Sequence, residues 1–279
     1  KYMKNKFKLN SSTLLVFILT TGVFGIINTE MGVIGILPLI AENFQVTVPE
    51  AGWTVSIFAL VVAISAPITP LLFSSINRKK VMILALGLFT LSNIISMMTT
   101  NFTVLLISRA LPAFLHPVYV SMAFTVAAAS VSKEKAPKAV AKVFIGVSAG
   151  MVLGVPVTSY IASEVSYSMS MLFFTVVNAL VLVATILFVP SMPVKEKLSY
   201  GTQLSVLKKK VVWYSILAIT LINGALFGFF SYMSDYLKTI TGVSYTVIST
   251  MLLIYGLANI IGNVIAGKQL AVNPVRSMI

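Results

Sequence analysis

The chain consists of long apolar runs separated by short polar stretches. A helix needs about 20 mostly apolar residues to cross the hydrocarbon core of a bilayer. Stretches of that length lie at approximately 14–40, 51–73, 80–99, 102–130, 139–162, 167–189, 211–237 and 245–267. This pattern predicts an all-α membrane protein with eight transmembrane spans.

Composition supports that prediction. Hydrophobic residues make up 58% of the 279 residues and charged residues 10%, against about 25% charged residues in soluble domains. Too few polar residues remain to cover the surface of a water-soluble fold. We therefore interpret the chain as a multi-pass protein that lies in a lipid bilayer.

Positive charge marks one side of the membrane. The net charge is +13, and lysine and arginine gather in every second loop: the N-terminal tail, 78–80, 133–142 and 195–210. The intervening loops carry Glu42, Glu50 and Glu164. Cytoplasmic loops have such an excess of basic residues. We therefore predict a cytoplasmic N-terminus and attribute the charge to topology, not to a nucleic-acid ligand.

A faint internal repeat predicts the domain organisation. Aligning Pro70 with Gly267 and Asn77 with Pro274 gives a constant offset of 197 residues. Repeated halves are typical of secondary transporters. We predict a six-helix N-terminal half at 1–190, a cytoplasmic connector at 191–210, and at 211–279 the first two helices of an incomplete C-terminal half. The connector either forms a short amphipathic turn on the inner leaflet or is a solvated tether.

Motifs along nearly the whole chain carry a family resemblance. They are Thr29-Glu30-Met31 through Leu37-Pro38, Ala51-Gly52, Arg109 through His116, Gly150 through Pro156, and Gly256 through Asn263. With these residues the chain resembles the 12-span drug:proton antiporter branch of the major facilitator superfamily, especially its arabinose-efflux-permease-like members. One departure is in the loop after the second span, where the family has an aspartate and this chain has Ser74.

The resemblance implies the fold and a function. The fold would be a helical bundle with a six-helix half and the first two helices of a truncated second half. The function would be proton-coupled efflux of small organic solutes, such as drugs, sugars or nucleosides, by alternating access in the cell (inner) membrane. The partners would be the solute, the proton and the lipid bilayer, with the protein a monomer.

Other classes remain as alternatives or are excluded by missing motifs. A non-coupled channel or facilitator, and a transporter-like receptor or inactive fragment, would share the same pattern of spans. The sequence lacks a phosphate-binding glycine loop and HExxH, so we do not expect an enzyme. It has no cysteine and one histidine, so we expect neither a metal site nor a cofactor.

Ionisable residues inside the spans are the first candidates for a site. A charged group in the bilayer core costs roughly 3 kcal/mol or more and usually faces a partner or a water-filled path. Glu30 and Arg109 lie at similar predicted depth, which suits either proton coupling or a permanent structural pair. His116 follows Arg109 by seven residues, on the same helical face, and suits either a proton relay or packing. Asp235, near the outer end of its span, is either a coupling residue or a solvated interface residue.

Two further sets of residues suit transport or simple packing. Asn223, Phe227, Phe230 and Ser234 share one face of the seventh span, as residues spaced by three and four do. With Tyr119 they would line a substrate cavity. The resemblance assigns conformational switching to the remaining candidates: Gly150, Gly154, Pro156, Arg78, Lys79 and Lys80. Small residues spaced by four also allow close helix contact, and Pro156 favours a kink.

The charge pattern yields a test of topology. Because the chain has no cysteine, single cysteines can be introduced and labelled in intact cells with a membrane-impermeant maleimide. Gln45→Cys should be labelled and Asn77→Cys should not. Labelling of Asn77→Cys alone would reverse the predicted orientation.

Overall fold

The structure is a computed structural model that describes residues 2–193 and 208–272. Within these residues every regular element is a helix. The helices are α1 (Tyr2–Met31), η1 (Gly32–Ile36), α2 (Leu37–Phe44), α3 (Val48–Ala51), α4 (Trp53–Ser65), α5 (Thr69–Leu72), α6 (Arg78–Met98), α7 (Phe102–Ala113), α8 (His116–Ala129), η2 (Lys133–Lys135), α9 (Ala136–Glu164), α10 (Tyr167–Phe188), α12 (Lys210–Thr239) and α13 (Tyr245–Val272). Most of the predicted connector, 191–210, lies outside the described residues.

The helices confirm the predicted all-α membrane bundle. In the described part of the chain, seven helical segments are long and apolar enough to cross a membrane. They coincide with the first seven predicted spans. The eighth, 245–267, falls within α13 (Tyr245–Val272), and Tyr245–Ala258 of this helix is apolar. The helix was therefore predicted correctly.

Two predicted spans are interrupted near their middle, which the hydrophobic pattern did not reveal. The first span changes from α1 to the 3-10 helix η1 at Gly32 and resumes as α2, with a proline in the first turn of α2. The fourth span breaks between α7 and α8, with Pro112 before the break and Pro117 in the first turn of α8. Proline has no N–H to donate and fits the first helical turn, so each proline permits a new helix to begin inside an apolar run.

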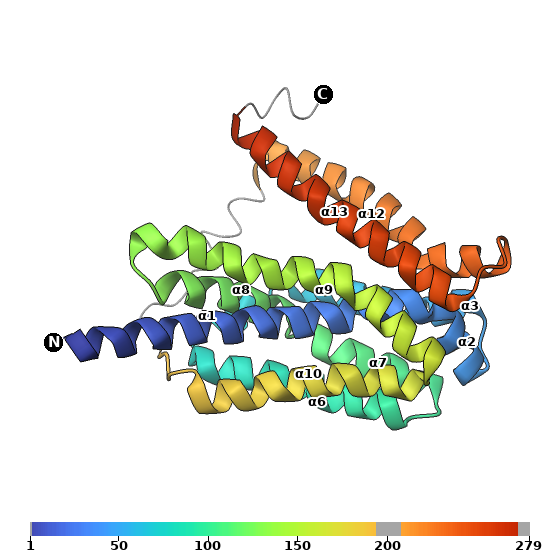
Figure 1. Cartoon of the computed structure of the whole chain (residues 1–279), viewed down its shortest axis with the longest axis horizontal. Helices are drawn as coiled ribbons and strands as arrows, with labels where there is room; N and C mark the ends of the chain where they lie inside the picture. Colours follow the sequence, from blue (N-terminus) through green and yellow to red (C-terminus); the bar gives the residue numbers. More distant parts are fainter. Residues whose placement is uncertain (1, 194–207, 273–279) are drawn as a thin grey trace.

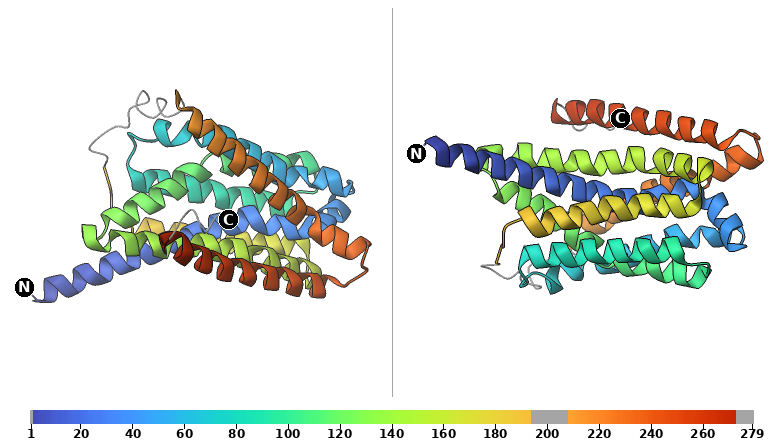
Figure 2. Two further views of the ribbon diagram at one scale, coloured as in Figure 1. Left: turned by 90° about the horizontal axis from the view of Figure 1, so that it is seen from above. Right: turned by 60° about the horizontal axis from the view of Figure 1, so that its bottom comes forward.

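Long helices pack side by side around α1 (Figures 1 and 2). α9 runs along α1, and α6 pairs with α10 on the other side. α13 packs against α9, while α12 contacts η1 and α2. In Figure 1, α12 and α13 meet the rest of the bundle at the end far from the N-terminus and diverge from it toward the other end.

Contacts at the far end join α12 and α13 to the first six spans. Thr246 at the start of α13 donates to Oε1 of Glu164, at the end of α9, over 2.9 Å. A Cβ built on Gly52 would lie 2.6 Å from the hydroxyl of Tyr232 on α12. Nearer the middle of both helices, one built on Gly256 would lie 2.8 Å from Val152 Cγ1 on α9. The Thr246–Glu164 and Gly52–Tyr232 contacts therefore hold α12 and α13 against the first six spans at this end.

The glycines of α9 face α1. A Cβ on Gly150 would lie 2.8 Å from Ile27 Cβ, and one on Gly154 would lie 3.0 Å from Asn28 Oδ1. The resemblance had placed this motif at the interface between halves, and α9 does contact α13. The glycine face itself, however, packs within the first six spans. α9 continues as one helix through the buried Pro156, and its second half bends (Figure 1).

This packing predicts which glycine tolerates a methyl group. A Cβ on Gly146 would collide with the backbone carbonyl of Thr20, whereas a Cβ on Gly87 has no atom within 4 Å. Gly146→Ala should lower the free energy of unfolding by about 1–3 kcal/mol, as overpacking does. Gly87→Ala should be neutral or stabilising by up to ~1 kcal/mol, because alanine has the higher helix propensity. Thermal unfolding in detergent compares the two, and equal shifts would contradict the α1–α9 contact.

Candidate functional site

Arg109 is 3% exposed and binds backbone carbonyls at the break in the first span. Its Nη1 donates to Thr29 O over 2.8 Å, its Nη2 to Glu30 O over 3.3 Å, and its Nε to Thr54 O over 3.3 Å. The last carbonyls of an α-helix lack partners within that helix, and Thr29 and Glu30 are in the last turn of α1. Arg109 supplies the missing donors.

The predicted pairing of Arg109 with the carboxylate of Glu30 takes another form. Arg109 contacts Glu30 through its backbone oxygen, and the only ion pair found among the described residues joins Glu30 to His116. His116 Nε2 lies 3.1 Å from Glu30 Oε2, with side-chain exposures of 12% and 18%. This is ion-pair distance, although the two groups are not aligned as a hydrogen bond.

The break in the fourth span explains why His116 reaches Glu30. His116 is the first residue of α8, and Pro117 follows it in the first turn. The start of a new helix turns the imidazole toward α1, next to Phe58 of α4. Phe58 meets the imidazole edge-on, with ring centroids 5.8 Å apart, and its face lies 4.9 Å from Arg109 Cζ. One buried aromatic ring thus contacts both Arg109 and His116.

A buried polar cluster supports the same segment from behind. Thr29 is 1% exposed, and its hydroxyl accepts a hydrogen bond from Asn178 Nδ2 over 2.9 Å and from Asn93 Nδ2 over 3.4 Å. The Thr29 hydroxyl itself donates to Gly25 O over 2.9 Å. Sequence reasoning named Thr29 only as part of the family motif, and it did not single out Asn93, Asn178, Thr54 or Phe58. All of these except Phe58 are polar residues within apolar runs, which was the available signal.

Glu30 opens on its other side to a cavity of about 480 Å³ between the first, second and seventh spans. Asn223 and Phe227 line it, as predicted for the stripe on α12. Thr220 and Ser231 add hydroxyl groups, and the remaining lining is largely apolar or aromatic. The volume and lining suit a small organic molecule.

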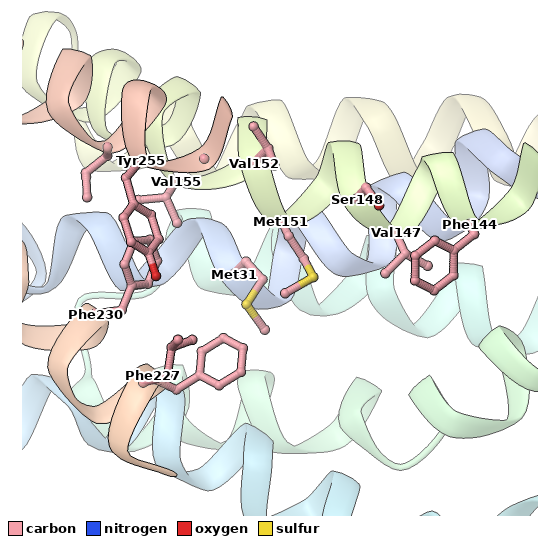
Figure 3. Close-up of a pocket in the computed structure, with 13 residues that line it drawn as sticks. Met31, Phe144, Val147, Ser148, Met151, Val152, Val155, Phe227, Phe230 and Tyr255 are labelled. Atoms are coloured by element: carbon pink, nitrogen blue, oxygen red, sulfur yellow. The ribbon is translucent and has the colours of Figure 1, made fainter. Parts of the chain in front are cut away.

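A second cavity, of about 90 Å³, adjoins the first at Met31 and Phe227 (Figure 3). In Figure 3 the side chains of Met31 and Met151 approach each other across it. Phe230 and Tyr255 stack with ring centroids 5.0 Å apart. This cavity between α9, α12 and α13 is lined mostly by apolar side chains, and Phe230 is one of its predicted members.

Three other candidates lie outside both cavities. Tyr119 is fully buried in the core and packs against Gly22, because α8 turns this side chain toward α1. Ser234, 1% exposed, belongs to the face of α12 that packs against the bundle. Asp235 is half-buried in the last turns of α12, where its backbone oxygen accepts from the Thr239 hydroxyl. Tyr119 and Ser234 are thus packing residues, which differs from their predicted place in the cavity.

The basic segment after the second span is fixed to the end of α10. Asn77 caps α6 and binds Ser191 Oγ over 2.7 Å, and the Arg78 N–H donates to Met192 O over 3.1 Å. Lys79 Nζ donates to Ile186 O over 2.8 Å, near the negative end of the helix dipole. Lys80 is exposed. These bonds join the segment to the end of α10 without the aspartate that the family has at the position of Ser74.

Interrupted membrane helices beside a cavity, with one carboxylate at its wall, are features that secondary transporters also have. Residues 14–276 match the Major Facilitator Superfamily. The chain belongs to this superfamily, which confirms the family resemblance at that level. The antiporter branch remains a prediction.

Curated relatives agree with this assignment. The chain is 31% identical over 250 residues to the inner membrane transport protein YdhP of Escherichia coli K12, which covers 90% of this chain and 64% of that protein. It is 32% identical over 266 residues to the uncharacterized MFS-type transporter YtbD of Bacillus subtilis, covering 93% and 66%. The putative transporter AraJ of E. coli K12 is 27% identical over 254 residues, covering 91% and 64%. These relatives are transporters and not enzymes, and the chain spans about 64% of the length of YdhP and AraJ.

Solved structures share the fold. A bacterial homolog of the human lysosomal transporter Spinster, in an inward-facing and unoccupied conformation, aligns with a TM-score of 0.72 and 17% identity, over 97% of this chain and 64% of that chain. The human organic anion transporter MFSD10 aligns with a TM-score of 0.64 and 17% identity, over 88% and 70%. At such identities the likeness concerns the fold alone.

The role of Arg109 as a helix-end donor can be tested by a conservative change. Arg109→Lys keeps the charge, but an ammonium group cannot replace the planar guanidinium that reaches three carbonyls. Hydrogen bonds from charged donors contribute about 1.5–3 kcal/mol each, so we expect a stability loss of roughly 2 kcal/mol or more. Amide exchange at residues 29–36 should also accelerate. Arg78→Lys is the matched control, since its hydrogen bond to Met192 uses the backbone. Unchanged exchange in Arg109→Lys would refute the role.

Proposed function

We propose that this chain carries the proton-binding and solute-binding site of a secondary active transporter that exports small organic solutes. The observation that carries the proposal is the position of Glu30. Its carboxylate lies at the wall of a cavity of about 480 Å³ and 3.1 Å from the imidazole of His116. An ionisable pair at mid-membrane depth is costly unless it serves a path for ions or substrates.

In this proposal Glu30 and His116 exchange the transported proton. A carboxylate beside an imidazolium is stabilised as an anion, whereas a desolvated carboxylate without that neighbour favours its neutral, protonated form. Movement that separates the two groups would load Glu30 with a proton, and their return would release it. Arg109 is the other cation near Glu30, and through its carbonyl contacts it holds the backbone of Thr29 and Glu30 in place.

Alternating access requires one end of the bundle to open while the other closes. Glu164–Thr246 and Gly52–Tyr232 join α12 and α13 to the first six spans at the end predicted to face outside. The divergence of α12 and α13 at the other end supports an inward-facing arrangement (Figure 1). In this state solute would enter from the cytoplasm and proton would leave to it, as export by antiport requires.

The lining of the cavity supports an amphipathic solute. Glu30, Thr220, Asn223 and Ser231 provide polar groups, and Met31, Phe58 and Phe227 provide apolar and aromatic contacts. A sugar needs hydrogen-bond partners around most of its surface, because unpaired polar groups are costly to bury. We therefore favour amphipathic drugs or nucleosides over simple sugars as solutes.

Substitution of Glu30 tests proton coupling. Glu30→Gln removes the ionisable group at nearly constant volume, so proton-driven concentration of solute should be lost while solute exchange without a pH gradient persists. Flux of a panel of amphipathic dyes, a nucleoside and a sugar into inside-out vesicles measures both. His116→Gln should weaken the dependence on the pH gradient. Asp235→Asn, at the outer end of α12, is the control and should retain coupled flux.

Three other outcomes would overturn the proposal. Concentrative flux in folded Glu30→Gln would place the proton site elsewhere. Flux in the unsubstituted protein that neither saturates nor responds to a pH gradient would indicate a channel or facilitator. Solute binding without flux would indicate a transporter-like receptor or an inactive protein.

A further inference from the structure

A basic cavity lies at the end of the bundle opposite to the Glu164–Thr246 contact. Its volume is about 600 Å³, and it lies between the start of the apolar part of α1 and the start of α9. Lys135, Lys138 and Lys142 line it. Their spacing of three and four residues places them on one helical face. The mechanism proposed above does not use this cavity.

Charge in this cavity is uncompensated within the described residues. Its described lining contains no aspartate or glutamate. No carboxylate of the described part of the chain lies within ion-pair distance of the three ammonium groups, since the ion pair found there joins Glu30 and His116. Hydroxyl groups of Thr13 and Ser132 also line the cavity. The donors are therefore arranged for an anion with several oxygen acceptors, such as a phosphate.

The remaining wall is apolar, and its position matches the membrane interface. Val16, Val131 and Ala139 contribute the apolar lining, and Val16 and Ala139 are buried against the core. The apolar span of the first helix begins at Ser12, which also lines the cavity. Lysine side chains at such a boundary place the charged group at headgroup level and the methylene chain along apolar surface.

We propose that this cavity binds the headgroup of an anionic phospholipid of the leaflet predicted to be cytoplasmic. The phosphate would accept from the three lysines and the hydroxyls, and the glycerol and upper acyl chain would lie against the apolar wall. The bound lipid would bridge α1 and α9 next to the hydrogen bond from the Thr20 hydroxyl to Lys142 O. A soluble phosphate would use the lysines but gain nothing from the apolar wall.

Native mass spectrometry of the protein in detergent can measure binding of phosphatidylglycerol, with phosphatidylcholine as the neutral comparison. The triple variant K135Q/K138Q/K142Q should lose affinity for phosphatidylglycerol. A lysine near an anionic headgroup contributes roughly fivefold to affinity, so three contribute on the order of a hundredfold. The matched control K208Q/K209Q/K210Q removes the same charge from exposed positions at the start of α12 and should retain the lipid.

Two single substitutions provide a second test in case the triple variant does not fold. Lys138→Glu should weaken phosphatidylglycerol binding, whereas Lys209→Glu should not, and circular dichroism confirms folding of both. Equal loss in the cavity variant and its control would show unspecific charge attraction and refute the site. Equal binding of phosphatidylcholine would do the same. Displacement of the lipid by millimolar inorganic phosphate would indicate a site for a soluble anion instead.

Discussion

The structure around the central cavity depends on one buried guanidinium. Arg109 donates to three backbone carbonyls, two on α1 and one on α4, and so connects three spans. A charge in this place would cost roughly 3 kcal/mol or more without partners. The helix break at Gly32 provides such partners, because it leaves carbonyl groups of the last turn of α1 free to accept. The helix break at Gly32 and the side chain of Arg109 therefore stabilise each other.

Sequence reasoning had treated Glu30 and Arg109 as one pair, whereas in the structure the two side chains have different partners. The charge of Arg109 neutralises a helix end, while the carboxylate of Glu30 points to His116 and to the cavity. The backbone on which Glu30 stands is held on one side by Arg109 and on the other by Thr29, Asn93 and Asn178. The backbone at Glu30 is therefore held from both sides.

The sequence predicted the spans well and the site only in part. Seven spans follow from apolar runs alone, because length and composition determine whether a helix can cross a bilayer. Glu30, Arg109 and His116 were found because ionisable residues are rare within such runs. Their actual pairing was not, because it depends on breaks at Gly32 and Leu115 that redirect the side chains. Tyr119 illustrates the same limit, since facing a cavity or the core is decided by helix rotation and not by residue type.

Both of these faces of α9 depend on glycine. Toward α1, Gly146 lies so close to the carbonyl of Thr20 that an added Cβ would collide with it. Toward α13, a Cβ added to Gly256 would lie 2.8 Å from Val152 Cγ1 and 3.1 Å from Val152 O. Because each contact needs a position without a side chain, α9 leaves little room for larger residues at either interface.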